Sequence, residues 1–168
     1  NTLLHVFEAY TELYRVAKLP EVKERLEWIM DTFADKVYNP KLHRQEVFFD
    51  DKWNSIIDLH SYGHDIETAW LVDRSVEVIG EKAYADKMTP ITLDLARQVY
   101  EVAFDGHSMA NECDKGVVDA NRVWWVQAET VVGFLNAASK CGKSTIEGQK
   151  YLKAADAEWE FIKKYVID

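Results

Sequence analysis

The sequence predicts an all-α protein that forms about half of an α/α barrel, the (α/α)6 toroid. Apolar residues recur at helical spacing in six segments, which fall into three antiparallel pairs. The pairs repeat, because Glu8, Glu67 and Glu129 align at spacings of 59 residues (8 to 67) and 62 residues (67 to 129). Solenoid families repeat at roughly 30–50 residues, so a period of about 60 with long loops favours a barrel.

The first two helices are predicted over residues 2–18 and 20–37. Pro20 suits the first turn of the second helix, where a missing N–H costs nothing. Asn39-Pro40 ends that helix. Residues 46–49 are expected to be extended, residues 50–52 to form a turn, and a loop to lead to His64. Apolar residues mark the buried faces of both helices: Leu4, Phe7, Leu13, Tyr14 and Ala17 in the first, and Val22, Leu26, Ile29, Met30, Phe33 and Val37 in the second.

The third helix is predicted over residues 64–79, with Gly80 as its C-cap. The fourth is predicted over 89–104, with Thr89 as N-cap and Pro90 in the first turn. Residues 105–121 should form a loop with two short strands, before helices over 124–140 and 146–166. No stretch resembles a linker, so residues 1–168 are expected to be a single segment of one catalytic domain.

Composition and charge exclude several classes of partner. The net charge of −9 argues against a nucleic acid or an anionic membrane, and no apolar run reaches the roughly 18 residues of a membrane span. Cys113 and Cys141 lack CxxC spacing, which indicates free thiols and predicts a cytoplasmic location. The chain starts at Asn1, without Met and inside a predicted helix, so we expect it to be the middle of a longer protein.

Chemistry-bearing residues gather where the third helix begins. Gly63 is expected to give a flexible turn, and His64 and Glu67 follow at a spacing that stacks them on one helix face. Histidine exchanges protons near neutral pH, and a carboxylate one turn away can orient the imidazole and raise its basicity. These residues predict an acid–base site.

The other two repeats extend this site into a rim. His5 stands three residues before Glu8, and Val126 stands three residues before Glu129. Trp124 and Trp125 come directly before Val126. If the three helices share a centre, their N-termini carry histidines, carboxylates and tryptophans. The free N–H groups there would stabilise an oxyanion.

Simpler interpretations stay open for most of these residues. The three glutamates could cap helices without taking part in catalysis. His5 and the two tryptophans could be residues of the hydrophobic core. His60 and His64, four residues apart, could form a metal site with Glu67, but Gly63 is expected to break the helix between them, so no metal is expected. His43 and His107 are expected to be solvated loop residues without partners.

Three motifs resemble the N-acylglucosamine 2-epimerase family in its cellobiose 2-epimerase branch. They are NTLLHVFEAY at residues 1–10, SYGHDIE at 61–67 and WWVQAE at 124–129, and residues 48–54 and 161–168 also fit. The resemblance spans the whole chain and implies the middle of an (α/α)6 barrel. It departs from the branch at Leu3, where the branch often has a histidine.

The resemblance implies epimerisation at C2 of the reducing-end sugar of a β-1,4-linked disaccharide such as cellobiose or mannobiose. One histidine removes the C2 proton, a cis-enediolate forms, and a second histidine returns a proton to the other face. No cofactor is implied. The catalytic positions correspond to His64 and its supporting Glu67, and the sugar-contacting positions to Asn1, His5, Trp124 or the adjacent Trp125, and Glu129.

Parts of the implied site lie outside this chain. The second catalytic histidine belongs to a later segment and an arginine to the first helices, so the chain alone is expected to be inactive. Its exposed half-barrel face could drive oligomerisation. Three alternatives stay open: an aldose isomerase or epimerase of the mannose or N-acylglucosamine type, a glycoside hydrolase using Glu67 and Glu129, and a non-catalytic helical scaffold.

Overall fold

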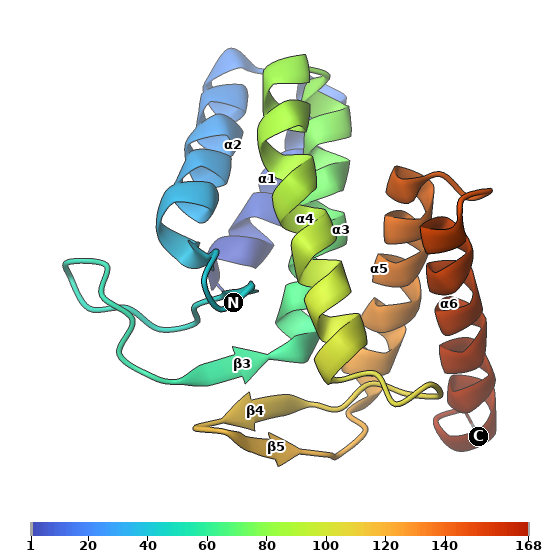
Figure 1. The fold of residues 1–168 in the computed structure, drawn as a ribbon. Coiled ribbons are helices and arrows are strands. Elements are labelled where there is room, and N and C mark those ends of the chain that lie inside the picture. The colour runs from blue at the N-terminus through green and yellow to red at the C-terminus, as the bar shows by residue number, and fades with distance from the viewer. Residues whose placement is uncertain (1, 168) are drawn as a thin grey trace.

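A computed structural model describes residues 2–167, which form three antiparallel helix pairs (Figure 1). A π-helical turn, Phe33–Val37, extends the second helix to the predicted end. Gly80 ends the third helix in a left-handed conformation, as predicted, with φ of 75°. The helices are α1 Thr2–Ala17, α2 Pro20–Thr32, α3 Tyr62–Ile79, α4 Lys82–Val102, α5 Trp124–Cys141 and α6 Ile146–Tyr165.

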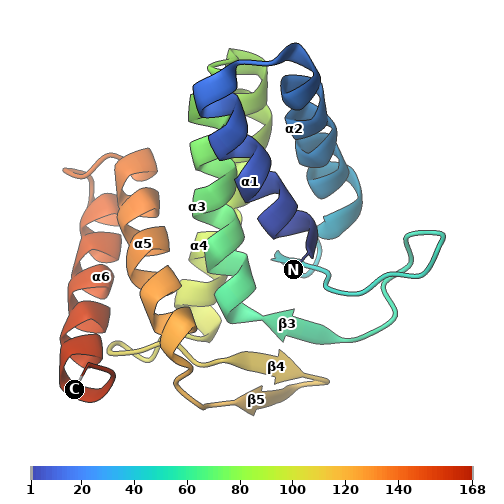
Figure 2. The same cartoon turned by 180° about the vertical axis from the view of Figure 1, so that it is seen from behind.

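The helices form two layers. Helices α1, α3 and α5 lie side by side, with α3 in contact with both neighbours (Figure 2). Helices α2, α4 and α6 pack on α1, α3 and α5 respectively. All three inner helices begin at the same end of the molecule (Figure 1). Each repeat therefore presents the N-terminus of its inner helix to the same side.

Helix α3 is the most buried element, because it is packed on two inner neighbours and on α4. Its polar side chains are therefore hydrogen-bonded to those neighbours. Asp73 accepts bonds from Thr92 Oγ1 on α4 at 2.9 Å and from Asn136 Nδ2 on α5 at 2.6 Å. Thr11 of α1 bonds Ser75 of α3. These bonds fix α3 relative to the helices on both sides.

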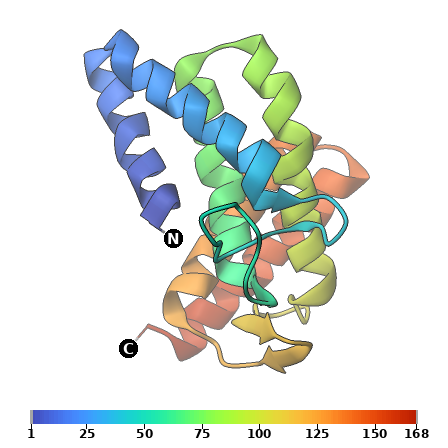
Figure 3. The same cartoon turned by 90° about the vertical axis from the view of Figure 1, so that its left-hand side faces the viewer.

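Two long loops join the pairs at the end where the inner helices begin. In the first, β1 Tyr38–Asn39 pairs with β2 Arg44–Gln45; this loop faces the viewer in Figure 3. β3 Leu59–Ser61, at the end of that loop, pairs with β4 Glu112–Asp114 of the second loop. β4 also pairs with β5 Val117–Asp119, which gives an antiparallel sheet in the order β3-β4-β5. The two strands predicted within residues 105–121 are thus confirmed.

Other parts of the first long loop differ from the prediction. Residues 46–49, expected to be an extended run, contain no named strand, and Phe49 forms an isolated antiparallel bridge with Ser55. The turn after it is confirmed, since Asp50 accepts bonds from the backbone N–H groups of Lys52 and Asn54. The expected loop before His64 contains strand β3, because residues of the second loop supply its partner.

The predicted start of α4 is wrong. The helix begins at Lys82, Thr89 is not its N-cap, and Pro90 lies inside it. Pro90 is exposed, so the carbonyl that loses its bond there can face water. The extra turns pack on α2, where Tyr84 and Lys87 both bond Asp31. Tertiary packing therefore outweighs the local preference of proline for a helix start.

None of the helices within residues 2–167 is both long and apolar enough to cross a membrane.

Candidate active site

The site is built where β3 runs into α3. Ser61 is extended at the helix N-cap, and Tyr62, Gly63 and His64 form the first turn. Gly63 is helical, so the flexible turn expected there is wrong. A Cβ at Gly63 would lie 2.7 Å from atoms of the Trp125 ring and of Val126. Glycine is required because the start of α5 packs directly on this turn.

His64 is held on two sides. Its Nδ1 is hydrogen-bonded to Ser61 Oγ at 2.7 Å. Its ring lies against Trp125, with the ring centroids 5.0 Å apart. Burial lowers the pKa of His64 to about 4, and the nearby His5 adds to this effect. The imidazole is therefore neutral at neutral pH, which is the form that can accept a proton.

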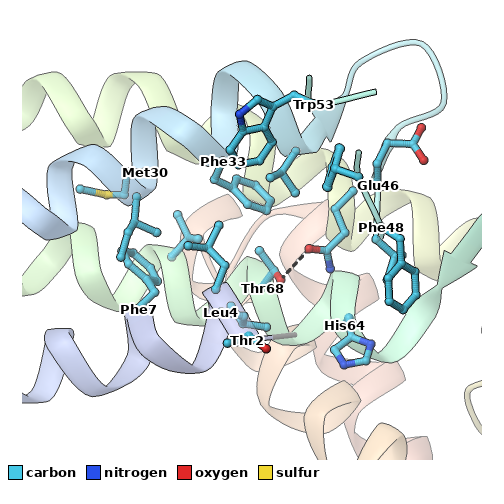
Figure 4. A pocket seen from close by; sticks show the side chains of 17 residues that line it. Thr2, Leu4, Phe7, Met30, Phe33, Glu46, Phe48, Trp53, His64 and Thr68 are labelled. Atoms are coloured by element: carbon cyan, nitrogen blue, oxygen red, sulfur yellow. Dashed lines mark hydrogen bonds between the residues drawn. The ribbon is translucent and has the colours of Figure 1, made fainter. Parts of the chain in front are cut away.

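His64 lines a cavity of about 380 Å³ enclosed by α1, α2, α3 and the segment 45–53 (Figure 4). The lining is mostly apolar, with Phe33, Phe48 and Trp53 among its members. Few groups there can solvate a charged imidazole, which accounts for the direction of its pKa shift. The volume falls within the range of roughly 300–1,000 Å³ typical of ligand pockets.

A carboxylate of α3, Glu67, and one of α5, Glu129, lie close enough to interact electrostatically. Glu67 is only 7% exposed, and burial followed by the charge of Glu129 raises its pKa to about 7. Burial also raises the pKa of Glu129, whose Oε2 accepts a hydrogen bond from Trp70 Nε1 at 2.7 Å. Burial and the charge of Glu129 therefore leave Glu67 protonated in part of the population near neutral pH.

Helix α1 adds a second histidine to this end of the molecule. His5 Nδ1 and Glu8 Oε2 are 3.2 Å apart, and both side chains are about half exposed. The charges of His5 and Glu8 both act on Glu67. The structure therefore places His5, Glu8, Glu67 and Glu129 within electrostatic reach of one another, and His5 within reach of His64.

The two adjacent tryptophans point in different directions. Trp125 lies against His64, whereas Trp124 is 68% exposed. The structure thus distinguishes two residues that the sequence could not, and it brings Trp125 to the site. Asn1, the remaining sugar-contacting prediction, lies outside the described residues.

Asp65, next to His64, was missed by sequence analysis. It is fully buried and accepts bonds from His60 Nε2 at 2.8 Å and from the Gln45 backbone N–H at 3.3 Å. Burial raises its pKa, and His60 opposes the shift. Asp65 therefore ties both ends of the first long loop to α3. The sequence signal that could have indicated Asp65 is its place directly after His64 in the SYGHD motif.

His60 and His43 both have partners in the structure. His60 is bonded to Asp65. His43 is not the partnerless solvated residue expected, because its Nδ1 lies 2.9 Å from Asp94 Oδ2 on α4. Across residues 2–167, no group of three or more His, Cys, Asp or Glu side chains could hold a metal ion. A metal-free reaction stays a prediction.

Comparison with known proteins assigns this arrangement to a family. The model of the N-acylglucosamine 2-epimerase family matches residues 1–168. The chain belongs to the N-acylglucosamine 2-epimerase family. It is 45% identical to a cellobiose 2-epimerase of Dictyoglomus turgidum and 41% identical to one of Ruminococcus albus. Each match covers all of this chain and 42% of the relative, so the chain spans about two fifths of the relatives' length.

Solved structures confirm the fold class. A sugar epimerase from a ruminal bacterium matches with a TM-score of 0.93 at 41% identity, over 99% of this chain and 41% of that one. Cellobiose 2-epimerase from Bacillus thermoamylovorans matches with a TM-score of 0.92 at 43% identity, over 99% and 42%. The three helix pairs of this epimerase-family chain are therefore part of an α/α barrel.

Gly63→Ala is expected to lower the activity of this family member strongly and its melting temperature only slightly. The added methyl group must displace Trp125, which holds the ring of His64. Overpacking costs about 1–3 kcal/mol, and the better helix propensity of alanine offsets about 1 kcal/mol of that. We expect a small fall in melting temperature and at least a tenfold loss of the activity proposed below, because misplaced catalytic groups react poorly.

Gly133→Ala is the matched control. Gly133 is a helical glycine at the same α3–α5 contact, but its added methyl group would meet Ile66 rather than Trp125. Differential scanning fluorimetry and the C2-proton exchange assay would be run on both variants in the full-length protein. Equal activity per folded molecule in the two variants would contradict a specific role for Gly63.

Proposed function

We propose that the full-length protein containing this chain is a sugar epimerase acting at C2 of the reducing-end sugar of a β-1,4-linked disaccharide. Cellobiose and mannobiose are the proposed substrates. The observation that carries the proposal is a neutral histidine, His64, in the wall of a ligand-sized cavity at the start of α3. Relatives named cellobiose 2-epimerase at 45% and 41% identity support the choice of substrate.

The proposed reaction starts from the open-chain aldose. Its C2–H bond is acidic because the adjacent C1 carbonyl accepts the electron pair as the bond breaks. The neutral imidazole of His64 takes that proton, and a cis-enediolate forms. A second histidine, from a part of the protein outside this chain, returns a proton to the opposite face of C2. The product is the C2 epimer, and both histidines return to their starting charge once they exchange protons with solvent.

The surrounding residues have proposed supporting roles. The free N–H groups at the starts of α3 and α5 would favour negative charge on the enediolate oxygens. Glu67, with a pKa raised to about 7, can be neutral in part of the population and so need not repel that charge. His5 and Glu129 are proposed sugar contacts, and Trp125 a wall against a sugar ring face. Asn1 and Trp124 are kept as proposed contacts of the complete barrel.

Proton NMR of cellobiose in D₂O with the full-length protein tests the proposal. We expect the C2 proton signal to disappear while signals of a mannose-type reducing end grow. A ketose product would instead indicate an aldose isomerase, in which the proton returns to C1. Release of free glucose would indicate a hydrolase. No exchange with cellobiose, mannobiose, lactose or mannose would reject the proposal and leave a binding scaffold.

Two wider proposals concern the setting of the enzyme. We propose a cytoplasmic location, since Cys113 and Cys141 are unpaired thiols.

We also propose that residues 1–168 belong to one catalytic domain. Apolar side chains exposed on the edge helices, including Val16 on α1 and Tyr165 on α6, would pack on the rest of the barrel or, in an isolated segment, on a second copy.

A further inference from the structure

Ser61, at the N-cap of α3, differs from Thr145, at the N-cap of α6, in what its hydroxyl bonds. A serine at the N-cap ordinarily accepts a hydrogen bond from the backbone N–H two or three residues later. Thr145, at the N-cap of α6, does so, since its Oγ1 accepts from the Gly148 N–H at 3.0 Å. Ser61 makes no such bond to α3. Its Oγ lies instead 2.7 Å from Nδ1 of His64.

The position of Ser61 Oγ is fixed by the surrounding structure. Ser61 is only 5% exposed, and it is the last residue of β3, paired in register with Glu112 of β4. The hydroxyl is therefore supplied by a strand of the sheet rather than by a mobile loop. On the other side of the imidazole, Trp125 lies against the ring. Two elements far apart in sequence thus set the orientation of one histidine.

We propose that Ser61 is a positioning residue that fixes the ring orientation and tautomer of His64, so that Nε2 exchanges the proton with C2 of the sugar. This inference rests on the proposed epimerase function. The Ser61 hydroxyl does not cap α3 but is hydrogen-bonded to the side chain of His64, three positions later. The loss of an ordinary cap at a buried helix start is otherwise unexplained.

The proton transfers balance without any change in Ser61. In the base form, Nδ1–H donates to Ser61 Oγ and Nε2 carries the lone pair. Nε2 takes the C2 proton, the electron pair of the C2–H bond passes to the enediolate, and Nδ1–H stays bonded to Oγ. In the reverse direction, Nε2 returns the proton to carbon. The hydroxyl only holds the Nδ1 proton in place throughout.

A neutral partner on Nδ1 also matters for the charge of His64. A carboxylate at that position would stabilise the imidazolium and raise the pKa of His64, whereas a hydroxyl leaves the effect of burial unopposed. Ser61 therefore orients the ring without making it cationic at rest. Of the other titratable groups at this site, His5 on α1 acts on His64, and Glu46 in the first long loop lines the same cavity. Glu8 on α1 and Glu129 on α5 act on Glu67 of α3.

The test uses Ser61→Ala and Ser61→Thr in the full-length protein with ¹⁵N-labelled histidine. In the alanine variant we expect the ¹⁵N shifts of His64 to show a mixture of tautomers. We also expect kcat for C2-proton exchange on cellobiose to fall about 10- to 100-fold at unchanged KM, a loss typical of a misoriented acid–base group. Threonine keeps the hydroxyl and should restore both properties. Ser61→Asp should move the acidic limb of the pH–kcat profile to higher pH.

Thr145→Ala is the matched control, because it removes an ordinary cap. It should lower the melting temperature without altering the His64 tautomer or kcat. An alanine variant at Ser61 with wild-type tautomer and wild-type kcat would overturn the inference while leaving the epimerase proposal intact. Conversely, a wild-type protein without C2 exchange would reject the proposed function, and the ¹⁵N spectra would still decide whether Ser61 fixes the tautomer.

Discussion

His64→Asn in the full-length protein is expected to lower C2-proton exchange on cellobiose by about 10³-fold, within the range attributed to a general acid–base group. The asparagine side chain is polar and of similar reach, but its amide cannot take a proton at neutral pH. His64 is only half-buried, and its contacts include one hydrogen-bonded serine and one ring. The variant should therefore fold, and the loss should appear in kcat rather than in the amount of folded protein.

The measurement is loss of the C2 proton signal in D₂O, followed over time by NMR. His107→Asn is the matched control, because His107 lies exposed in the second long loop and, among residues 2–167, only its backbone N–H is bonded, to Asp105. It should keep wild-type activity. Exchange by His64→Asn at more than a tenth of the wild-type rate would show that another group removes the proton.

Glu158→Gln is expected to stabilise the protein at alkaline pH by about 5 kcal/mol, because the pKa of Glu158 rises from 4.5 to about 8 and each pKa unit corresponds to about 1.4 kcal/mol. Glu158 lies on α6, is fully buried, and neither of its carboxylate oxygens has a hydrogen-bond partner among the described residues. Burial raises its pKa to about 8, despite the opposing charge of Arg122 and the nearby Met109 backbone. Asp105 adds to the rise.

The direction of the pH dependence follows from proton binding. The folded state keeps the proton on Glu158 up to about pH 8, whereas the unfolded chain loses it near its ordinary value of 4.5. Between these pH values the folded state binds more protons, so stability falls as pH rises. The stabilising effect of the proton is complete below about pH 4.5 and is lost by about pH 8. The glutamine variant lacks this dependence.

Urea unfolding of both proteins at pH 5 and at pH 9 measures the effect. The two free energies of unfolding should differ by less than about 1 kcal/mol at pH 5, where glutamine resembles protonated glutamate, and by about 5 kcal/mol at pH 9. Glu160→Gln, at an exposed position of the same helix, should show no such change between the two pH values. A pH-independent difference for Glu158→Gln would mean that its carboxyl group is not desolvated.

Local signals in the sequence were sufficient for most of the helices. The apolar spacing and stop residues of α1, α3, α5 and α6 are properties of each segment, and the structure has these helices within two residues of the predicted ends. α4 differs because its first turns are stabilised by Asp31, a residue of another helix. Periodicity and proline rules contain no information about such a partner.

The site shows the same division. The spacing of His64 and Glu67 and the repeats at His5 and Glu129 are visible in the sequence, because helix geometry alone puts such residues on one face. The choice between Trp124 and Trp125 is not visible, since neighbouring helix positions differ by about 100° and only the packing of α5 on α3 selects one.

The sequence by itself determined the helix pairs, their repeat and the residues able to move a proton, because these depend on side-chain type and on spacing along one segment. Only the tertiary structure decided the environment of His64: the tight approach at Gly63, the ring of Trp125 and the hydroxyl of Ser61. Burial and charge at that point arise from elements that are distant in the chain, and they set the pKa and orientation that the chemistry needs.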